Sequence, residues 1–329
     1  MFERKPPGER VPGKPRRAGA ALGPFFVAGS GAALPIRLSD IGARLRAFRM
    51  GRGLSPEAAA ERLGISRAAL YRAEKGQISK IDTLTRISEV LDVSLASLLG
   101  VGVEYVDTAV GFFERMRQLE KESEQVIGLF GPVSYLLTSD AYDQMLIEVL
   151  LDLVPSDPEQ AADAQRSLTA LMDILRERKT QFRSRQNLIV SLISSSDIER
   201  FLLHGALGRH DLPEAVIADR RRKARSEVEH IEAMLRRPPT GVQIGIVLDS
   251  TPATTFQIFR QPDRSVLAIS PFRLGEQPNV SLGVALITSA SEPMLLHERI
   301  AQRLWDGALK SVEAADHLGV LIARYGIEA

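Results

Sequence analysis

The chain has 329 residues, of which 44% are hydrophobic and 25% are charged, so its composition is that of a folded globular protein with room for two domains. It contains no cysteine, which excludes disulfides, thiolate metal sites and cysteine nucleophiles. The net charge of +1 hides an asymmetry, because residues 1–100 carry 17 Lys and Arg against 9 Asp and Glu, whereas residues 101–329 carry 25 against 32. An anionic partner is therefore expected at the N-terminal end.

Residues 1–36 are rich in Pro, Gly and Arg and show neither a helical nor a strand period, so we predict a disordered basic tail. Small apolar residues follow Arg16 and Arg17, as in a secretory signal, but Pro24 and three glycines interrupt them. No run of about 18 uninterrupted apolar residues occurs anywhere in the chain, so no membrane segment is predicted. We expect a cytoplasmic protein.

Residues 37–100 read as an all-α domain of five short helices, and the most specific pattern lies in residues 53–100. Ser55 is placed to cap a helix that begins with Pro56 and ends at Gly64, where glycine can adopt a left-handed conformation. Ser66 is placed to cap the next helix, which stops at Gly76. Two capped helices joined by a tight turn are typical of a helix that is presented to a partner.

The helix of residues 66–75 has two sides. Leu70 and Ala73 are expected to face the core, and the outward positions are Arg67, Ala68, Tyr71 and Arg72. A DNA major groove about 12 Å wide admits one helix, whose outward N-terminal residues reach the base edges. Arginine can donate two hydrogen bonds to guanine, and an alanine methyl can contact thymine. The pattern therefore predicts double-stranded DNA as the partner.

The segment from residue 41 to 100 resembles the helix-turn-helix domains of the Cro and lambda-repressor family. The matching features are Leu54-Ser55, Ala60, Leu63-Gly64-Ile65-Ser66, Arg67, Leu70, Glu74-x-Gly76, Leu91-x-Val93-Ser94 and Leu98-Leu99. The resemblance implies an ion pair between Arg49 and Glu74. It also implies base contacts at Arg67, Ala68 and Arg72, and phosphate contacts near Ser55, Ser66, Lys75, Gln77 and Lys80. The predicted DNA-binding set is Ser55, Pro56, Ser66, Arg67, Ala68, Ala69, Tyr71, Arg72, Lys75, Gln77 and Lys80.

The sequence departs from the family at Pro56, where many members have glutamine. Proline has no N–H and no polar side chain, so it cannot donate a hydrogen bond to a phosphate. One customary contact with the DNA backbone is therefore missing.

Residues 101–329 are predicted to form an α+β domain that binds an effector or a partner and mediates oligomerisation. A long helical region is expected to about residue 190. Within it, apolar positions recur as three heptads, which fit either a dimer seam or an internal core helix. These positions are Tyr105, Ala109, Phe112, Met116, Leu119, Ser123 and Val126.

After Pro238 and Pro239 the hydrophobic period changes from that of a helix to that of a strand. Strands are expected in residues 241–249, 254–261, 264–270 and 281–289, which predicts a sheet of about four mainly antiparallel strands. One C-terminal helix, residues 292–318, follows. Its Trp305 is expected to be a packing residue.

The stretches GPVSYLLTSDAYDQML, RERKTQFRSRQ and FLLHGALGR resemble, in order and spacing, the C-terminal domain of helix-turn-helix regulators of the Scr1 antitoxin type. That resemblance implies regulation or partner binding. The five histidines lack the spacing of a metal site, and no phosphate-binding loop or nucleophile elbow occurs. We therefore expect no enzymatic activity, catalytic residue, metal site or cofactor. The basic runs 176–179 and 220–223 are interpreted as solvated helix faces.

Two functions fit these patterns. The first is a sequence-specific transcriptional regulator, of repressor type, which binds a palindromic operator as a homodimer through the helix of residues 66–75. Its C-terminal domain would sense a small-molecule effector or a protein partner. The alternative is an antitoxin or protein-interaction adaptor that autoregulates its operon.

Overall fold

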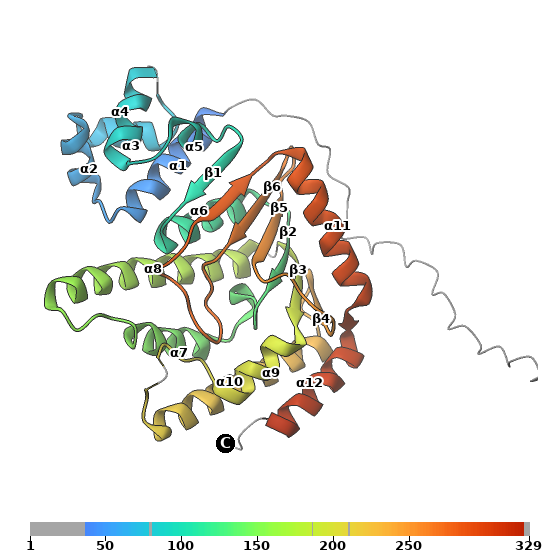
Figure 1. The fold of residues 1–329 in the computed structure, drawn as a ribbon. Helices are drawn as coiled ribbons and strands as arrows, with labels where there is room; N and C mark the ends of the chain where they lie inside the picture. The colour runs from blue at the N-terminus through green and yellow to red at the C-terminus, as the bar shows by residue number, and fades with distance from the viewer. Residues whose placement is uncertain (1–36, 79–80, 186, 210, 326–329) are drawn as a thin grey trace, which may run out of the picture.

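The computed structural model describes residues 37–78, 81–185, 187–209 and 211–325 (Figure 1). Five helices come first, as expected: α1 (Leu38–Gly51), α2 (Pro56–Leu63), α3 (Arg67–Glu74), α4 (Ile81–Leu91) and α5 (Leu95–Leu99). They pack around a shared core that includes Leu45, Leu70 and Ile87. The predicted tail of residues 1–36 lies outside the described residues.

An eight-stranded mixed sheet follows, with the strand order β1-β7-β6-β5-β2-β3-β4-β8. Strands β2, β3 and β4 are parallel to one another, and all other neighbours are antiparallel. The strands are β1 (Val103–Val106), β2 (Gln125–Phe130), β3 (Leu188–Ser194), β4 (Val242–Val247), β5 (Thr255–Arg260), β6 (Ser265–Ser270), β7 (Ala285–Thr288) and β8 (Leu309–Lys310).

Helices cover the two faces of the sheet unequally (Figure 1). One face carries a thick helical layer, whose core includes Phe112, Met116 and Phe201. The opposite face is covered by α11 (Ser291–Gly307), whose Met294 and Ala301 join a separate apolar cluster. The thick layer consists of α6 (Ala109–Glu122), the 3-10 turn η1 (Tyr135–Leu137), α7 (Asp140–Leu151), α8 (Pro158–Arg185), α9 (Ser195–His204), α10 (Glu214–Arg236) and α12 (Ser311–Tyr325).

The prediction of about four mainly antiparallel strands is wrong. The four expected strands exist as β4 to β7, but β1, β2, β3 and β8 belong to the same sheet, and β4 pairs with β3 and β8 rather than with β5. Strands β2 and β3 are buried on both faces, so their sequences QVIGLF and LIVSLIS are mostly apolar and do not alternate cleanly. Such runs cannot be told from buried helix by periodicity.

The long helical region predicted to residue 190 is interrupted by β1, β2 and β3. Of the heptad positions, Tyr105 lies on β1 and Val126 on β2, while α6 carries the buried Ala109, Phe112, Met116 and Leu119. These four side chains belong to the protein core, which supports the core-helix interpretation rather than a dimer seam. The single predicted C-terminal helix is also wrong, because β8 separates α11 from α12.

Both basic runs are partly buried, so their interpretation as solvated faces is wrong for three of their cations. Each of the three pairs with a carboxylate on another helix or at its end: Arg178 with Glu120 at 2.6 Å, Lys179 with Asp143 at 2.6 Å, and Arg220 with Asp152, the C-cap residue of α7, at 3.3 Å. A buried charge is retained only when it is paired and hydrogen-bonded. These cations therefore connect helices within the thick layer.

Candidate DNA-binding site

The helices α2 and α3 are each capped by a serine. The hydroxyl of Ser55 accepts a hydrogen bond from the N–H of Ala58 at 3.1 Å, and that of Ser66 accepts one from the N–H of Ala69 at 3.1 Å. Between the helices, Gly64 has φ of +64°, a left-handed conformation that side chains disfavour. The caps and this glycine fix the angle at which α3 leaves α2.

Helix α3 has a buried and an exposed side, as the sequence pattern predicts. Leu70 is fully buried and Ala73 is 5% exposed. The side chains of Arg67, Ala68, Tyr71 and Arg72 are exposed, and Ala69 is half-buried. This orientation leaves the predicted base-reading residues accessible to solvent, and their contact with DNA stays a prediction.

The predicted phosphate contacts surround α3. Ser55, Ser66, Lys75 and Gln77 are exposed and Pro56 is half-buried, whereas Lys80 lies outside the described residues. Ser55 and Ser66 stand at helix N-termini, where backbone N–H groups and the helix dipole favour an anion. Both helix N-termini are therefore suited to contact a phosphate.

A buried ion pair links α3 to α1. The Nε atom of Arg49 lies 2.6 Å from Oε1 of Glu74, and Nη1 of Arg49 donates to the carbonyl of Leu54 at 2.8 Å. This pair, implied by the family resemblance, is confirmed. The two helices also approach closely, because a Cβ on Gly42 would lie only 2.5 Å from the backbone N of Gly76.

Glu57 was missed as a functional residue by the sequence analysis. Its carboxylate lies 2.8 Å from Nη1 of Arg67, whose Nη2 donates to the hydroxyl of Tyr71 at 3.3 Å. A hydrogen bond from its own backbone N–H, with the charge of Arg67 adding to it, lowers the pKa of Glu57. Glu57 therefore forms an ion pair with Arg67, one of the predicted base-reading arginines. The available signal was its position in the first turn of α2, close in the motif to the start of α3.

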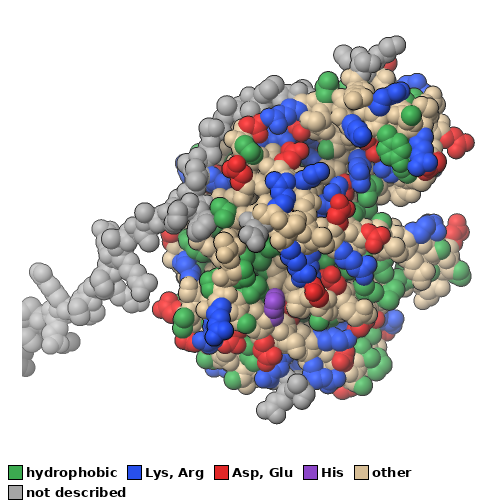
Figure 2. Space-filling model, turned by 180° about the vertical axis from the view of Figure 1, so that it is seen from behind, with side chains coloured by type: hydrophobic (Ala, Val, Ile, Leu, Met, Phe, Trp, Pro, Cys, Tyr) green, Lys and Arg blue, Asp and Glu red, His purple; other side chains and the backbone are tan. Residues whose placement is uncertain are grey.

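The helical domain carries only a small net positive charge. Residues 40–100 contain ten Lys and Arg against seven Asp and Glu. Figure 2, which views the molecule from behind, shows both signs interspersed over the helical domain. Attraction to DNA would therefore depend on the side chains around α2 and α3, not on the net charge of the domain.

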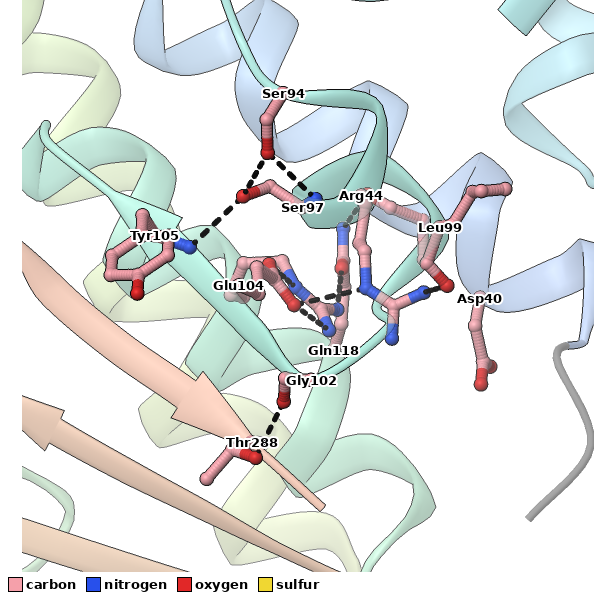
Figure 3. A network of polar contacts seen from close by, with 12 residues as sticks. Asp40, Arg44, Ser94, Ser97, Leu99, Gly102, Glu104, Tyr105, Gln118 and Thr288 are labelled. Atoms are coloured by element: carbon pink, nitrogen blue, oxygen red, sulfur yellow. Dashed lines mark hydrogen bonds and ion pairs between the residues drawn. The ribbon is translucent and has the colours of Figure 1, made fainter. Parts of the chain in front are cut away.

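A buried polar network attaches α1 to the sheet (Figure 3). Glu104 of β1, which is 2% exposed, accepts hydrogen bonds from Nε of Arg44 at 3.0 Å and from Nε of Arg115 at 2.6 Å. Arg44 belongs to α1 and Arg115 to α6, so one carboxylate joins three elements. Gln118 of α6 donates to the carbonyl of Ala43 in α1 at 3.0 Å.

The connection from α5 to β1 is also held by hydrogen bonds. Nη1 of Arg44 donates to the carbonyl of Leu99 at 3.2 Å, and the N–H of Tyr105 donates to the hydroxyl of Ser97 at 3.4 Å (Figure 3). Three residues, 100–102, separate α5 from β1. The helices α1 to α5 and the sheet thus share one hydrophobic core and have no long linker between them.

Glu114 of α6 contributes a further ion pair across this interface. Its Oε1 lies 3.2 Å from Nε of Arg46 in α1, and its Oε2 lies 2.7 Å from Nε of Arg117. Burial acts to raise the pKa of Glu114, but the hydrogen bond from Arg117 and the charges of both arginines outweigh it and lower the pKa. The carboxylate is therefore charged in the folded protein.

Two kinds of feature are absent from the residues that the structure describes. None of their helices is both long and apolar enough to cross a bilayer. They also contain no cluster of three or more His, Asp or Glu side chains that could hold a metal ion.

Comparison with known proteins agrees with the geometry of α1 to α5. A family model described as a helix-turn-helix domain matches residues 40–100 and does not extend into the sheet domain. No curated protein matches the chain. Residues 40–100 are a helix-turn-helix DNA-binding domain of the Cro and lambda-repressor type.

Proposed function

We propose that this chain is a cytoplasmic transcriptional regulator that binds operator DNA as a homodimer, with α3 in the major groove. The observation that carries the proposal is the exposed row of Arg67, Ala68, Tyr71 and Arg72 on a helix whose other side is buried. The ion pair of Arg49 with Glu74 supports it, because a helix that reads bases must be held rigidly in its domain.

In this proposal Arg67 and Arg72 read base edges and the helix ends position the duplex. A bidentate arginine contact with guanine discriminates against other bases by about 5- to 150-fold. Ser55, Ser66 and Lys75 would contact phosphates, which fix the register of the protein on DNA without reading sequence. Arg67 would exchange its contact with Glu57 for a contact with DNA.

The homodimer follows from the length of DNA that one domain can cover. A single helix in one groove contacts too few base pairs for useful specificity, whereas two domains related by a two-fold axis read a palindrome. The half-sites would lie about 34 Å apart, or a multiple of that distance.

The sheet domain would serve as the sensing part of the regulator. The contacts of Glu104 and Gln118 with α1 support this role, because they join the DNA-binding helices firmly to the sheet domain. A ligand or partner that favours one arrangement of two sheet domains would then also change the separation of the two α3 helices.

The test is selection of bound sequences from a random pool of DNA duplexes. We expect a palindromic site whose affinity falls about 5- to 150-fold in Arg67→Ala and in Arg72→Ala, with a smaller loss on random DNA. Arg299→Ala, which removes an exposed arginine from α11, is the matched control. Equal losses on selected and random DNA would refute base reading by these arginines. Light scattering that finds a monomer on the selected site would refute the dimer alone.

A further inference from the structure

A cleft of about 350 Å³ lies at the β4 edge of the sheet, remote in the fold from α3. It is formed by the end of α10, the first half of β4, the end of α11 and the β8 strand. Its lining includes Met234, Leu235, Pro238, Val242, Trp305 and Lys310. Lys310 carries the one charged side chain among the described residues that line it. The cleft is therefore mostly apolar, with a single cation and no carboxylate in its wall.

The cleft exists because the ladder between β4 and β8 is short. Only Gly245 and Ile246 of β4 pair with β8, since the chain turns away at Ser311, whose φ is +50°. The carbonyl of Gly241 accepts a hydrogen bond from Ile189 of β3, so the backbone groups of Ile244, three residues on, face the β8 side, where the register places Ser311 opposite them. The cleft thus lies beyond the end of the short ladder between β4 and β8, and its walls are mostly apolar.

Lys310 is suited to receive an anion. Its Nζ lies 4.9 Å from the centre of the Trp305 ring and donates to the carbonyl of Ala308 at 2.9 Å. Within the described part of the chain, its ammonium group is not within ion-pairing distance of any carboxylate. Burial lowers the pKa of Lys310, and the charges of Asp306 and Glu313 offset this only in part. A bound carboxylate would supply the missing counter-charge.

We propose that this cleft binds a small organic carboxylate with a flat or branched apolar body. The carboxylate accepts a hydrogen bond from Lys310, and the apolar body lies against Trp305 and Met234. The volume falls within the range of small-molecule sites, about 300–1,000 Å³. A small carboxylate would be the ligand class of the proposed sensing domain. Binding in the cleft does not depend on that proposed function, whereas regulation by the ligand rests on it.

Trp305 provides a direct readout, because it is the one tryptophan in the sequence. The full chain, without DNA, is titrated with phenylacetate, cyclohexanecarboxylate, isovalerate and benzoate, and binding is followed by Trp305 emission and by calorimetry. We expect a saturable response with a Kd of about 1 mM or tighter for at least one of them. The matching neutral amide should bind about tenfold more weakly or worse, because it cannot pair with Lys310.

Variants locate the binding in the cleft. Lys310→Met keeps the apolar stem over Trp305 and should weaken carboxylate binding about tenfold or more, whereas Lys310→Arg should retain it. Arg299→Met removes an exposed charge from α11, at a position that does not line the cleft, and should leave binding unchanged. Met234→Phe, which fills the cleft, should also weaken binding.

Three results would overturn the proposal: none of the four carboxylates binding with a Kd of about 1 mM or tighter, equal affinity for acid and amide, or full affinity in Lys310→Met. Because these titrations contain no DNA, they are independent of the α3 experiment. Loss of DNA binding in Arg67→Ala would leave the cleft proposal standing. Absence of carboxylate binding in the titrations would leave the DNA-binding proposal standing.

Discussion

Glu104 accepts a hydrogen bond from Arg44 at 3.0 Å, and this contact joins the first strand of the sheet to the first helix of the DNA-binding domain. The same carboxylate accepts two hydrogen bonds from Arg115, at 2.6 and 3.1 Å. Burial lowers the pKa of Arg44, which reflects the cost of desolvating its charge. Removal of one partner from a buried ion pair leaves an uncompensated charge inside the protein.

We therefore expect Glu104→Gln to lower the free energy of unfolding by about 3–5 kcal/mol, because two buried guanidinium groups lose their counter-charge. Denaturant unfolding measures this change, and hydrogen exchange should show faster exchange in α1 and α6. Glu89→Gln, at an exposed position of α4, is the control and should change stability by less than about 0.5 kcal/mol. A Glu104 variant as stable as the Glu89 variant would show that the network contributes little.

The helical domain could be predicted because its signals are local. Ser55, Gly64 and Ser66 define the turn within twelve residues, and the inward Leu70 follows from helical periodicity. The family resemblance added the pair of Arg49 and Glu74, whose partners lie 25 residues apart. No local pattern reports a contact at that separation.

The sheet could not be predicted because its central strands carry no distinctive period. Strands β2 and β3 are covered on both faces, so their apolar residues run together and resemble buried helix. The Glu104 network joins residues 11 and 60 positions apart, and Glu57 meets Arg67 only through the folded turn. Such relationships depend on tertiary packing.

Gly42→Ala tests the close approach of α1 and α3. Alanine normally stabilises a helix interior by about 1 kcal/mol relative to glycine. At this position, however, the new Cβ would lie 2.5 Å from the backbone N of Gly76, which cannot move without separating the helices. We expect a net loss of about 1–3 kcal/mol in the free energy of unfolding.

Gly307→Ala is the matched control, because a Cβ on Gly307 would have nothing within 4 Å. It should leave stability unchanged or raise it by up to about 1 kcal/mol. Thermal unfolding of both variants measures the difference. Equal behaviour of the two alanine variants would disprove the steric role of Gly42.

The lowered pKa of Glu114 makes stability dependent on pH. A carboxylate whose pKa is lower in the folded than in the unfolded protein stabilises the fold above the unfolded value of 4.5, and that stabilisation is lost as the pH falls through the folded value. We expect the free energy of unfolding to fall below about pH 4.5, and the fall to be shallower in Glu114→Gln. Denaturant midpoints between about pH 3 and 6 measure both slopes. Parallel curves for the two proteins would contradict the assignment to Glu114.

Glu57→Gln tests whether the carboxylate beside Arg67 opposes DNA binding. The charge of Glu57 lies on the surface that DNA would approach, and it occupies Nη1 of Arg67. Its removal should strengthen binding to all duplexes by about threefold to tenfold at low salt, and by less at high salt, because the lost repulsion is screened. Fluorescence anisotropy on selected and random DNA at several salt concentrations measures the change.

Glu313→Gln, an equal change of charge at an exposed position of α12, should have no effect on DNA affinity. The two kinds of DNA separate two roles of Glu57. A gain on both supports simple electrostatic opposition. A loss confined to the selected site would contradict that view, and would mean that Glu57 holds Arg67 in the orientation in which it reads a base.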